Sequence, residues 1–160
     1  MLLGELCRRL GVPYRQARYV LEEDILPPGV DPAPDRGNHR QLSSEQAFWL
    51  GIVLKLKEAG MKTPLAATMA SLTAGIFARV DLRKYDPEFE PFRGRLHARL
   101  NWYAELGDLR FIRLRAEREK PREALLDGTW FPIDGKKAKE QPSPVVRIQV
   151  DLSQIGRLLS

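Results

Sequence analysis

The 160-residue chain contains few of the residues that covalent or metal chemistry requires, with one cysteine, Cys7, and two histidines, His39 and His97. A single cysteine excludes a disulfide framework and a cysteine-rich zinc site. Neither histidine has a second ligand residue close to it in the sequence. We therefore expect no metal site and no other cofactor.

Other signatures are missing as well. No Ser/His/Asp set or phosphate-binding loop occurs at a useful spacing, so we do not expect an enzyme. No apolar run is long enough to span a membrane. The start of the chain, Met1–Glu5, lacks the basic flank and apolar core of a secretory signal. We expect a cytoplasmic protein without a membrane partner.

The composition is that of a globular protein, with 43% hydrophobic and 29% charged residues and a net charge of +5. A basic balance favours a polyanionic partner only mildly. Residues 1–62 carry nine Lys/Arg and eight Asp/Glu, a net charge of +1. If the first part of the chain binds nucleic acid, its positive charge must therefore be gathered on one face.

The first forty residues are the most informative part of the sequence. Leu3–Leu10 has apolar residues at helical spacing, with Arg8 and Arg9 on the other side. The Gly11-Val12-Pro13 break ends this helix, and a second helical run extends from Tyr14 to Asp24. Two short helices joined by a glycine-containing turn predict a helix-turn-helix, which places its second helix against DNA.

A wing and two more helices are expected next. Residues 27–38 contain four prolines and two glycines, which exclude a helix, and His39–Leu42 is a short strand candidate. A proline-rich loop that closes on a short basic strand is typical of a wing. Ser43 or Ser44, with Glu45 or Gln46, is expected to cap a third helix over about 44–59. A fourth helix is predicted from Leu65 to about Phe77.

The second half has a different pattern. Residues 81–95 have no clean period, whereas residues from 97 onward alternate around a Gly107-Asp108 turn, which predicts a β-hairpin. We expect a charged loop over 117–128 with a short helical turn at 121–126. Further strands are predicted over 129–133 and 145–152. A last helix over 154–159, capped by Ser153, would dock either on its own sheet or on a second subunit.

These elements predict an α+β protein. An N-terminal winged helix-turn-helix of about four helices plus wing spans residues 1–78, and a linker spans 79–96. A small antiparallel β-rich domain with a short C-terminal helix spans 97–160. Its interleaved arginines favour a solvated sheet face, with a second nucleic-acid surface as the alternative, and its aromatic residues favour core over a ligand pocket. The residues concerned are Arg110, Arg113 and Arg115, and Trp102, Trp130 and Phe131.

Residues 3–69 resemble the DNA-binding domain of the mercury-resistance-regulator (MerR) family. Each piece is weak alone, but their order and spacing are fairly specific. The pieces are Gly4-Glu5-Leu6 with Leu10-Gly11-Val12, Arg18-Tyr19 with Ile25-Leu26-Pro27-Pro28, His39-Arg40-Gln41-Leu42-Ser43, and Lys57-Glu58-Ala59-Gly60-Met61.

The resemblance implies a winged helix-turn-helix, usually dimeric, that binds and distorts promoter DNA. Arg18 and Tyr19 stand where the family uses second-helix side chains on DNA, and Arg40 stands where it uses a wing arginine on phosphate. Three positions depart from the family pattern: Val20, His39 and Leu42. Because 81–95 replaces the family's long dimerising helix, we expect the dimer contact within 97–160.

The sequence thus predicts a sequence-specific DNA-binding transcriptional regulator that acts on double-stranded DNA as a homodimer. Its C-terminal half is a candidate dimerisation or effector module, for a small-molecule or protein effector that the sequence does not identify. Side chains of the second helix would lie in the major groove, and wing side chains would lie on the phosphate backbone. The candidate residues are Tyr14, Arg15, Gln16, Arg18 and Tyr19 in the helix, and Arg36, His39 and Arg40 in the wing.

Two alternatives stay open. An excisionase-like architectural protein would bend DNA without sensing a ligand. A protein-interaction adaptor would have lost DNA binding in its helical half and would bind a partner through its β-rich half. Salt dependence separates DNA binders from the adaptor, because each phosphate contact weakens as salt rises.

Overall fold

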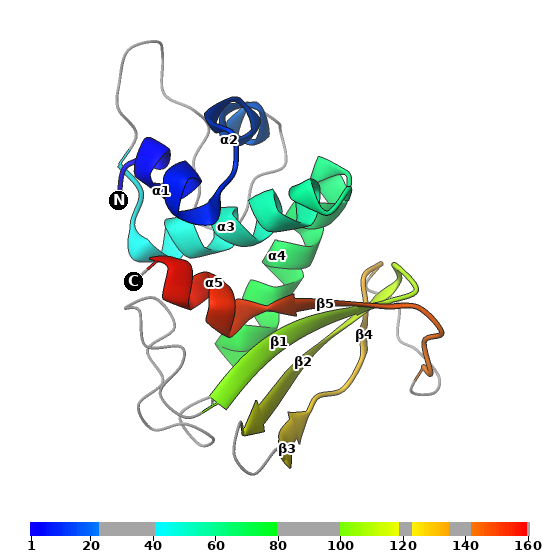
Figure 1. The fold of residues 1–160 in the computed structure, drawn as a ribbon. Coiled ribbons are helices and arrows are strands. Elements are labelled where there is room, and N and C mark those ends of the chain that lie inside the picture. Colours follow the sequence, from blue (N-terminus) through cyan, green and yellow to red (C-terminus); the bar gives the residue numbers. More distant parts are fainter. Residues whose placement is uncertain (23–40, 80–99, 119–122, 135–141, 160) are drawn as a thin grey trace.

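The computed structural model describes residues 1–22, 41–79, 100–118, 123–134 and 142–159. Four helices come first: α1 (Leu3–Leu10), α2 (Tyr14–Leu21), α3 (Ser44–Glu58) and α4 (Thr63–Arg79). An antiparallel sheet and one more helix, α5 (Leu152–Leu159), follow (Figure 1). The predicted α+β class, with a helical N-terminal part and a β-rich second half, is confirmed.

The first two helices form as the apolar spacing predicts. In α1 the apolar side, which includes Cys7, is buried, and Gly11 ends the helix with a φ of 69°. This left-handed conformation suits glycine, which has no Cβ to clash. In α2 the inner side is buried through Ala17, Val20 and Leu21. Burial raises the pKa of the Cys7 thiol, as expected for a core cysteine.

Helix α3 is the centre of the helical part. Ser43 and Gln46 form a reciprocal capping box at its start, which confirms the predicted cap. Nine of its residues are buried, on more than one side, because neighbours surround it. Helix α4 begins at Thr63, because Pro64 fits the first turn of a helix.

The sheet has the strand order β3-β2-β1-β5, with β4 also paired to β2. Its main hairpin joins β1 (Leu100–Gly107) to β2 (Phe111–Arg118), as predicted. The turn uses Asp108 and Leu109 at positive φ, 48° and 56°. This backbone conformation matches the twist of a tight hairpin. The remaining strands are β3 (Glu123–Asp127), β4 (Phe131–Pro132) and β5 (Arg147–Asp151).

Two local predictions are wrong. The expected loop with a helical turn over 117–128 is instead the end of β2 followed by β3. The segment EALLD favours helix intrinsically, but pairing with β2 overrides that preference. The predicted Ser153 cap is replaced by Asp151, whose carboxylate accepts the Gln154 N–H at 2.7 Å. The Ser153 hydroxyl instead accepts the backbone N–H of Trp102 at 2.8 Å.

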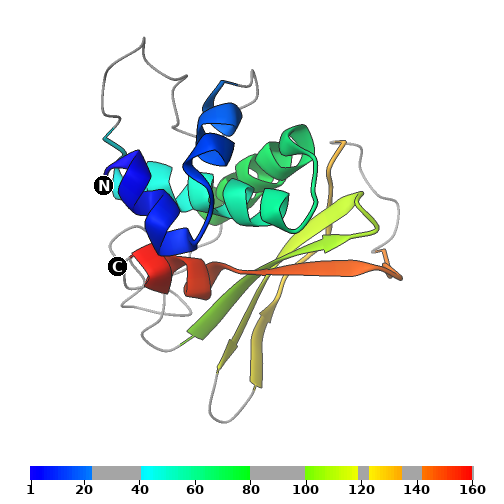
Figure 2. The same ribbon diagram turned by 45° about the horizontal axis from the view of Figure 1, so that its top comes forward.

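Helix α5 joins the two halves of the molecule. It packs on α1 and α3 as well as on β1, so it docks on the helical part and not only on its own sheet (Figure 2). Gly51 of α3 faces it, and a Cβ there would already be in van der Waals contact with Ile155, at 3.4 Å, which leaves little room for a larger side chain. One hydrophobic core runs from the helices into the sheet, through the rings of Phe77 and Trp102 among others. The predicted linker lies outside the described residues except for Arg79.

Candidate nucleic-acid interface

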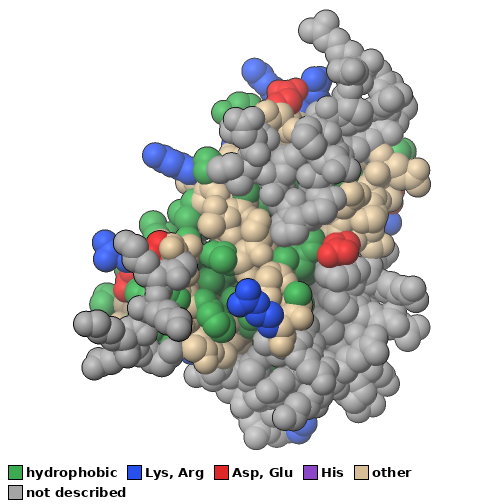
Figure 3. Space-filling model, turned by 180° about the vertical axis from the view of Figure 1, so that it is seen from behind, with side chains coloured by type: hydrophobic (Ala, Val, Ile, Leu, Met, Phe, Trp, Pro, Cys, Tyr) green, Lys and Arg blue, Asp and Glu red, His purple; other side chains and the backbone are tan. Residues whose placement is uncertain are grey.

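The outer side of α2 carries the predicted DNA-binding side chains. Tyr14 and Tyr19 are 52% and 54% exposed, and Arg15 and Arg18 are also exposed. Gln16 is half-buried at the flank of the helix. Five residues at helical spacing line a hollow of about 360 Å³ on this side: Tyr14, Arg15, Arg18, Tyr19 and Glu22. We call these five residues the α2 outer face. Figure 3 shows Lys and Arg side chains projecting at this end of the molecule.

The two arginines of the α2 outer face differ in their partners. Arg18 Nη2 lies 3.2 Å from Glu22 Oε1, one turn along the helix. Arg15 makes no hydrogen bond or ion pair with any residue that the structure describes. Both guanidinium groups reach solvent, so each is in a position to donate to a base edge or to a phosphate.

Lys57 is a residue of this surface that the sequence analysis did not single out. Its Nζ lies 4.4 Å from the centre of the Tyr19 ring and donates to Thr63 Oγ1 at 2.6 Å. Lys57 therefore links the end of α3, the start of α4 and the exposed side of α2. Lys57 and Tyr19 are 38 positions apart in the sequence and meet only when α2 packs on α3. Sequence spacing alone therefore could not predict the contact.

The predicted wing residues Arg36, His39 and Arg40 lie outside the described residues. The base of the wing is described. Leu2 and Gln41 form an antiparallel bridge. The Met1 amine donates to the Leu42 carbonyl at 2.8 Å, and the Leu42 N–H donates back to the Met1 carbonyl at 2.8 Å. These contacts hold Gln41 and Leu42, which follow the predicted wing, beside the residues that precede α1.

The geometry is that of a helix-turn-helix, in which one short helix supports a second whose outer side is polar and aromatic. Comparison with known proteins finds one similar family. Residues 1–72 match the model of the family described as "MerR HTH family regulatory protein". The N-terminal part of the chain is therefore similar to the MerR-type helix-turn-helix domain of DNA-binding transcriptional regulators. No curated protein and no solved structure gave a significant match.

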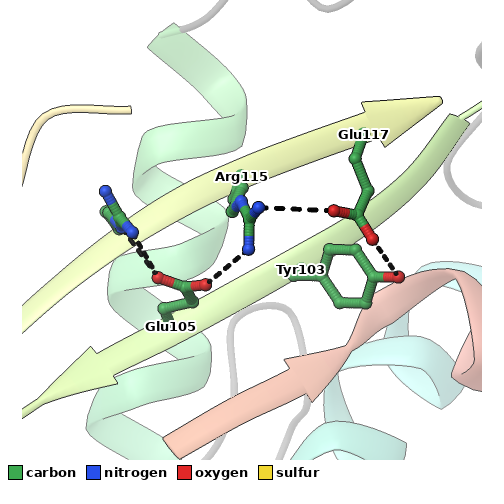
Figure 4. Close-up of polar contacts among 5 residues, drawn as sticks. Tyr103, Glu105, Arg115 and Glu117 are labelled. Atoms are coloured by element: carbon green, nitrogen blue, oxygen red, sulfur yellow. Dashed lines mark hydrogen bonds and ion pairs between the residues drawn. The ribbon is translucent and has the colours of Figure 1, made fainter. Parts of the chain in front are cut away.

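The arginines of β2 take part in a network of ion pairs and hydrogen bonds on the face of the sheet that points away from the helices (Figure 4). Glu105 Oε2 lies 2.8 Å from Arg113 Nη2, and Glu105 Oε1 lies 3.5 Å from Arg115 Nη1. Arg115 also contacts Glu117 at 3.3 Å, and the Tyr103 hydroxyl donates to Glu117 at 3.2 Å. Two acidic and two basic groups neutralise one another here.

The network corrects the expectation of a solvated sheet face. Arg113 is only 9% exposed, and its guanidinium lies 4.5 Å from the centre of the Trp130 ring. Glycine at position 107 makes room chiefly for Pro144, with which a Cβ would collide, and also for the Trp130 ring, which would lie 3.1 Å from it. Arg110 is exposed as expected. Trp102 and Trp130 are buried as predicted, whereas Phe131 is 41% exposed.

None of the helices in the described ranges is long and apolar enough to cross a membrane. Among the side chains that the structure describes, no three His, Cys, Asp or Glu residues are grouped as a metal site requires. The expectation that the protein needs no cofactor stays a prediction.

Proposed function

We propose that this protein is a sequence-specific DNA-binding transcriptional regulator that inserts α2 into the major groove of duplex DNA. The observation that carries the proposal is the α2 outer face. It presents two arginines and two tyrosines to solvent on a helix whose other side is buried, within a MerR-type domain. A helix supported in this way is the element that enters the major groove in helix-turn-helix proteins.

Each side chain has a proposed task that follows from its chemistry. Arg15 and Arg18 have the donor fork that pairs with guanine O6 and N7, and Gln16 can pair with adenine. Tyr19 is proposed to donate its hydroxyl to a phosphate, with Lys57 beside it adding positive charge. In the wing, Arg36, His39 and Arg40 are proposed to lie on the phosphate backbone.

We also propose that two copies act together, because one recognition helix reads too few base pairs for a specific site. The proposed contact is the end of the sheet that carries the β1–β2 turn. There Asp108 accepts the backbone N–H of Val146 at 2.8 Å, which draws two segments of exposed apolar residues together. The exposed apolar side chains of this end are Leu109, Phe131, Val145 and Val146.

A second copy fits this patch because the surrounding charges are mixed. Arg110, Asp134 and Arg147 are exposed around it, so a two-fold arrangement can place opposite signs against each other. An apolar patch of this kind is typical of protein contacts. The proposal assigns no catalytic activity to the protein, places it in the cytoplasm where it meets DNA, and leaves the effector of the β-rich half unnamed.

Selection from a pool of random duplexes, at two salt concentrations, tests the proposed function. The intact protein should enrich a two-fold symmetric motif, and an Arg18→Ala/Arg40→Ala variant should lose it. Salt-sensitive binding without a motif would favour the architectural alternative. No binding by the intact protein at low salt would contradict both readings and favour the adaptor.

A further inference from the structure

The α2 outer face contains an acidic group that a DNA-binding surface does not obviously need. Glu22 follows the last residue of α2 and is 54% exposed, on the same side of the helix as the two arginines. A carboxylate placed near DNA phosphates is repelled by them, so on charge alone Glu22 should weaken binding. Its presence therefore requires a benefit other than affinity.

The ion pair suggests what that benefit is. Glu22 accepts from one nitrogen of Arg18, Nη2, at 3.2 Å. No other hydrogen bond or ion pair holds Arg18 among the residues that the structure describes, so Nη1, Nε and the second N–H of Nη2 stay available. An unpaired arginine on a surface helix samples many rotamers, and fixing it costs conformational free energy. One carboxylate contact restricts the guanidinium and leaves its remaining donors available on a side chain that is 60% exposed.

We propose that Glu22 is a specificity-determining residue, which holds the Arg18 guanidinium in the orientation that reads guanine and disfavours its use on phosphate. The inference rests on the proposed DNA binding of α2. Glu22 does not touch the base in this account and acts through Arg18. A guanidinium held by a carboxylate reads a guanine edge in one geometry, whereas a released guanidinium can bond any nearby phosphate.

Two changes in DNA binding are expected of Glu22→Gln. The variant should bind scrambled duplexes two- to threefold more tightly, because a negative charge near the phosphates is gone. It should also lose discrimination at one guanine. A bidentate arginine–guanine pair discriminates by about 10- to 100-fold, and we expect a loss of about three- to tenfold of that. A residue that merely adds negative charge would change both duplexes equally.

The experiment compares the affinity of the intact protein for three duplexes. They are the motif that the wild-type protein enriches from a random pool, the same motif with each guanine replaced in turn, and a scrambled sequence. Arg18→Ala identifies the guanine that Arg18 reads. In the Arg18→Ala background, Glu22→Gln should no longer change the discrimination at that guanine, because the group through which it acts is missing.

Glu5→Gln is the matched control. Glu5 forms the same kind of pair with Arg9, one turn along α1, at 2.8 Å, but away from the α2 outer face. This variant should change neither affinity nor discrimination. If Glu22→Gln leaves the ratio between motif and guanine-replaced duplex unchanged, the inference is overturned while the proposed function stands. If the wild-type protein enriches no motif, the proposed function itself fails.

Discussion

Replacing Glu105 by alanine should destabilise the protein strongly, because it breaks the network on the outer face of the sheet. The Glu105 side chain is 4% exposed and contacts the side chains of Arg113, 11% exposed, and Arg115, 30% exposed. Removing one partner of a buried ion pair costs up to about 3–5 kcal/mol, because the remaining charge stays buried with one partner fewer. Arg115 keeps Glu117 and some solvent, so we expect the lower end, about 3 kcal/mol.

Urea unfolding followed by tryptophan fluorescence measures this loss. The transition should shift to lower urea at unchanged slope, and the melting temperature should fall by about 6–12 °C for a chain of this size. Glu5→Ala is the control, since the Glu5–Arg9 pair has the same 2.8 Å distance but is about one-third exposed. It should cost no more than about 1 kcal/mol.

A second variant separates the effect of an unpaired charge from the effect of lost side-chain volume. Replacing Glu105 by leucine and Arg113 by methionine together removes both charges and keeps much of the volume. Because apolar replacements of buried ion pairs are often nearly neutral, the double variant should recover most of the stability. A Glu105→Ala variant that costs no more than Glu5→Ala would refute the reasoning.

Three further outcomes are expected. Lys57→Met should weaken binding to all duplexes by a similar factor and lower the salt slope by about 1, measured by fluorescence anisotropy, whereas a sequence-dependent loss would contradict the backbone role. Gly51→Leu should cost about 1–3 kcal/mol in thermal unfolding, because the added atoms meet Ile155 of α5, and an unchanged melting temperature would argue against that docking. Val146→Asp should shift sedimentation from dimer to monomer without lowering the melting temperature; a dimer that persists would place the contact elsewhere.

Local sequence signals predicted the helical half well. Three features are confirmed: the spacing of apolar residues in α1, the end of that helix at Gly11 and the Ser43 cap. Each depends on only a few neighbouring residues. The hairpin around Asp108 was also predictable, because alternation and turn chemistry are local. The exposed side of α2 could be predicted because its apolar residues fix which side of the helix is buried.

Features that depend on long-range pairing could not be predicted in this way. The segment of β3 is a strand only because β2 lies beside it, and Gly128 allows the close contact in which its N–H donates to the Leu114 carbonyl at 3.0 Å. In the sequence, Arg113 alternates with apolar residues, which is the pattern of a residue on the solvent-exposed face of a strand. Its burial depends on Glu105 of β1 and on Trp130, which precedes β4. Lys57 was missed for the same reason.

A competition measurement tests whether the α2 outer face reads DNA sequence. The intact protein is titrated with a labelled motif duplex at 150 mM salt, about physiological strength, in the presence of unlabelled motif or scrambled competitor. We predict a preference for the motif of about 1,000-fold or more, which falls by about 10- to 100-fold in Arg18→Ala while the fold is retained. Equal competition by motif and scrambled duplex, or an unchanged preference in Arg18→Ala, would contradict the account.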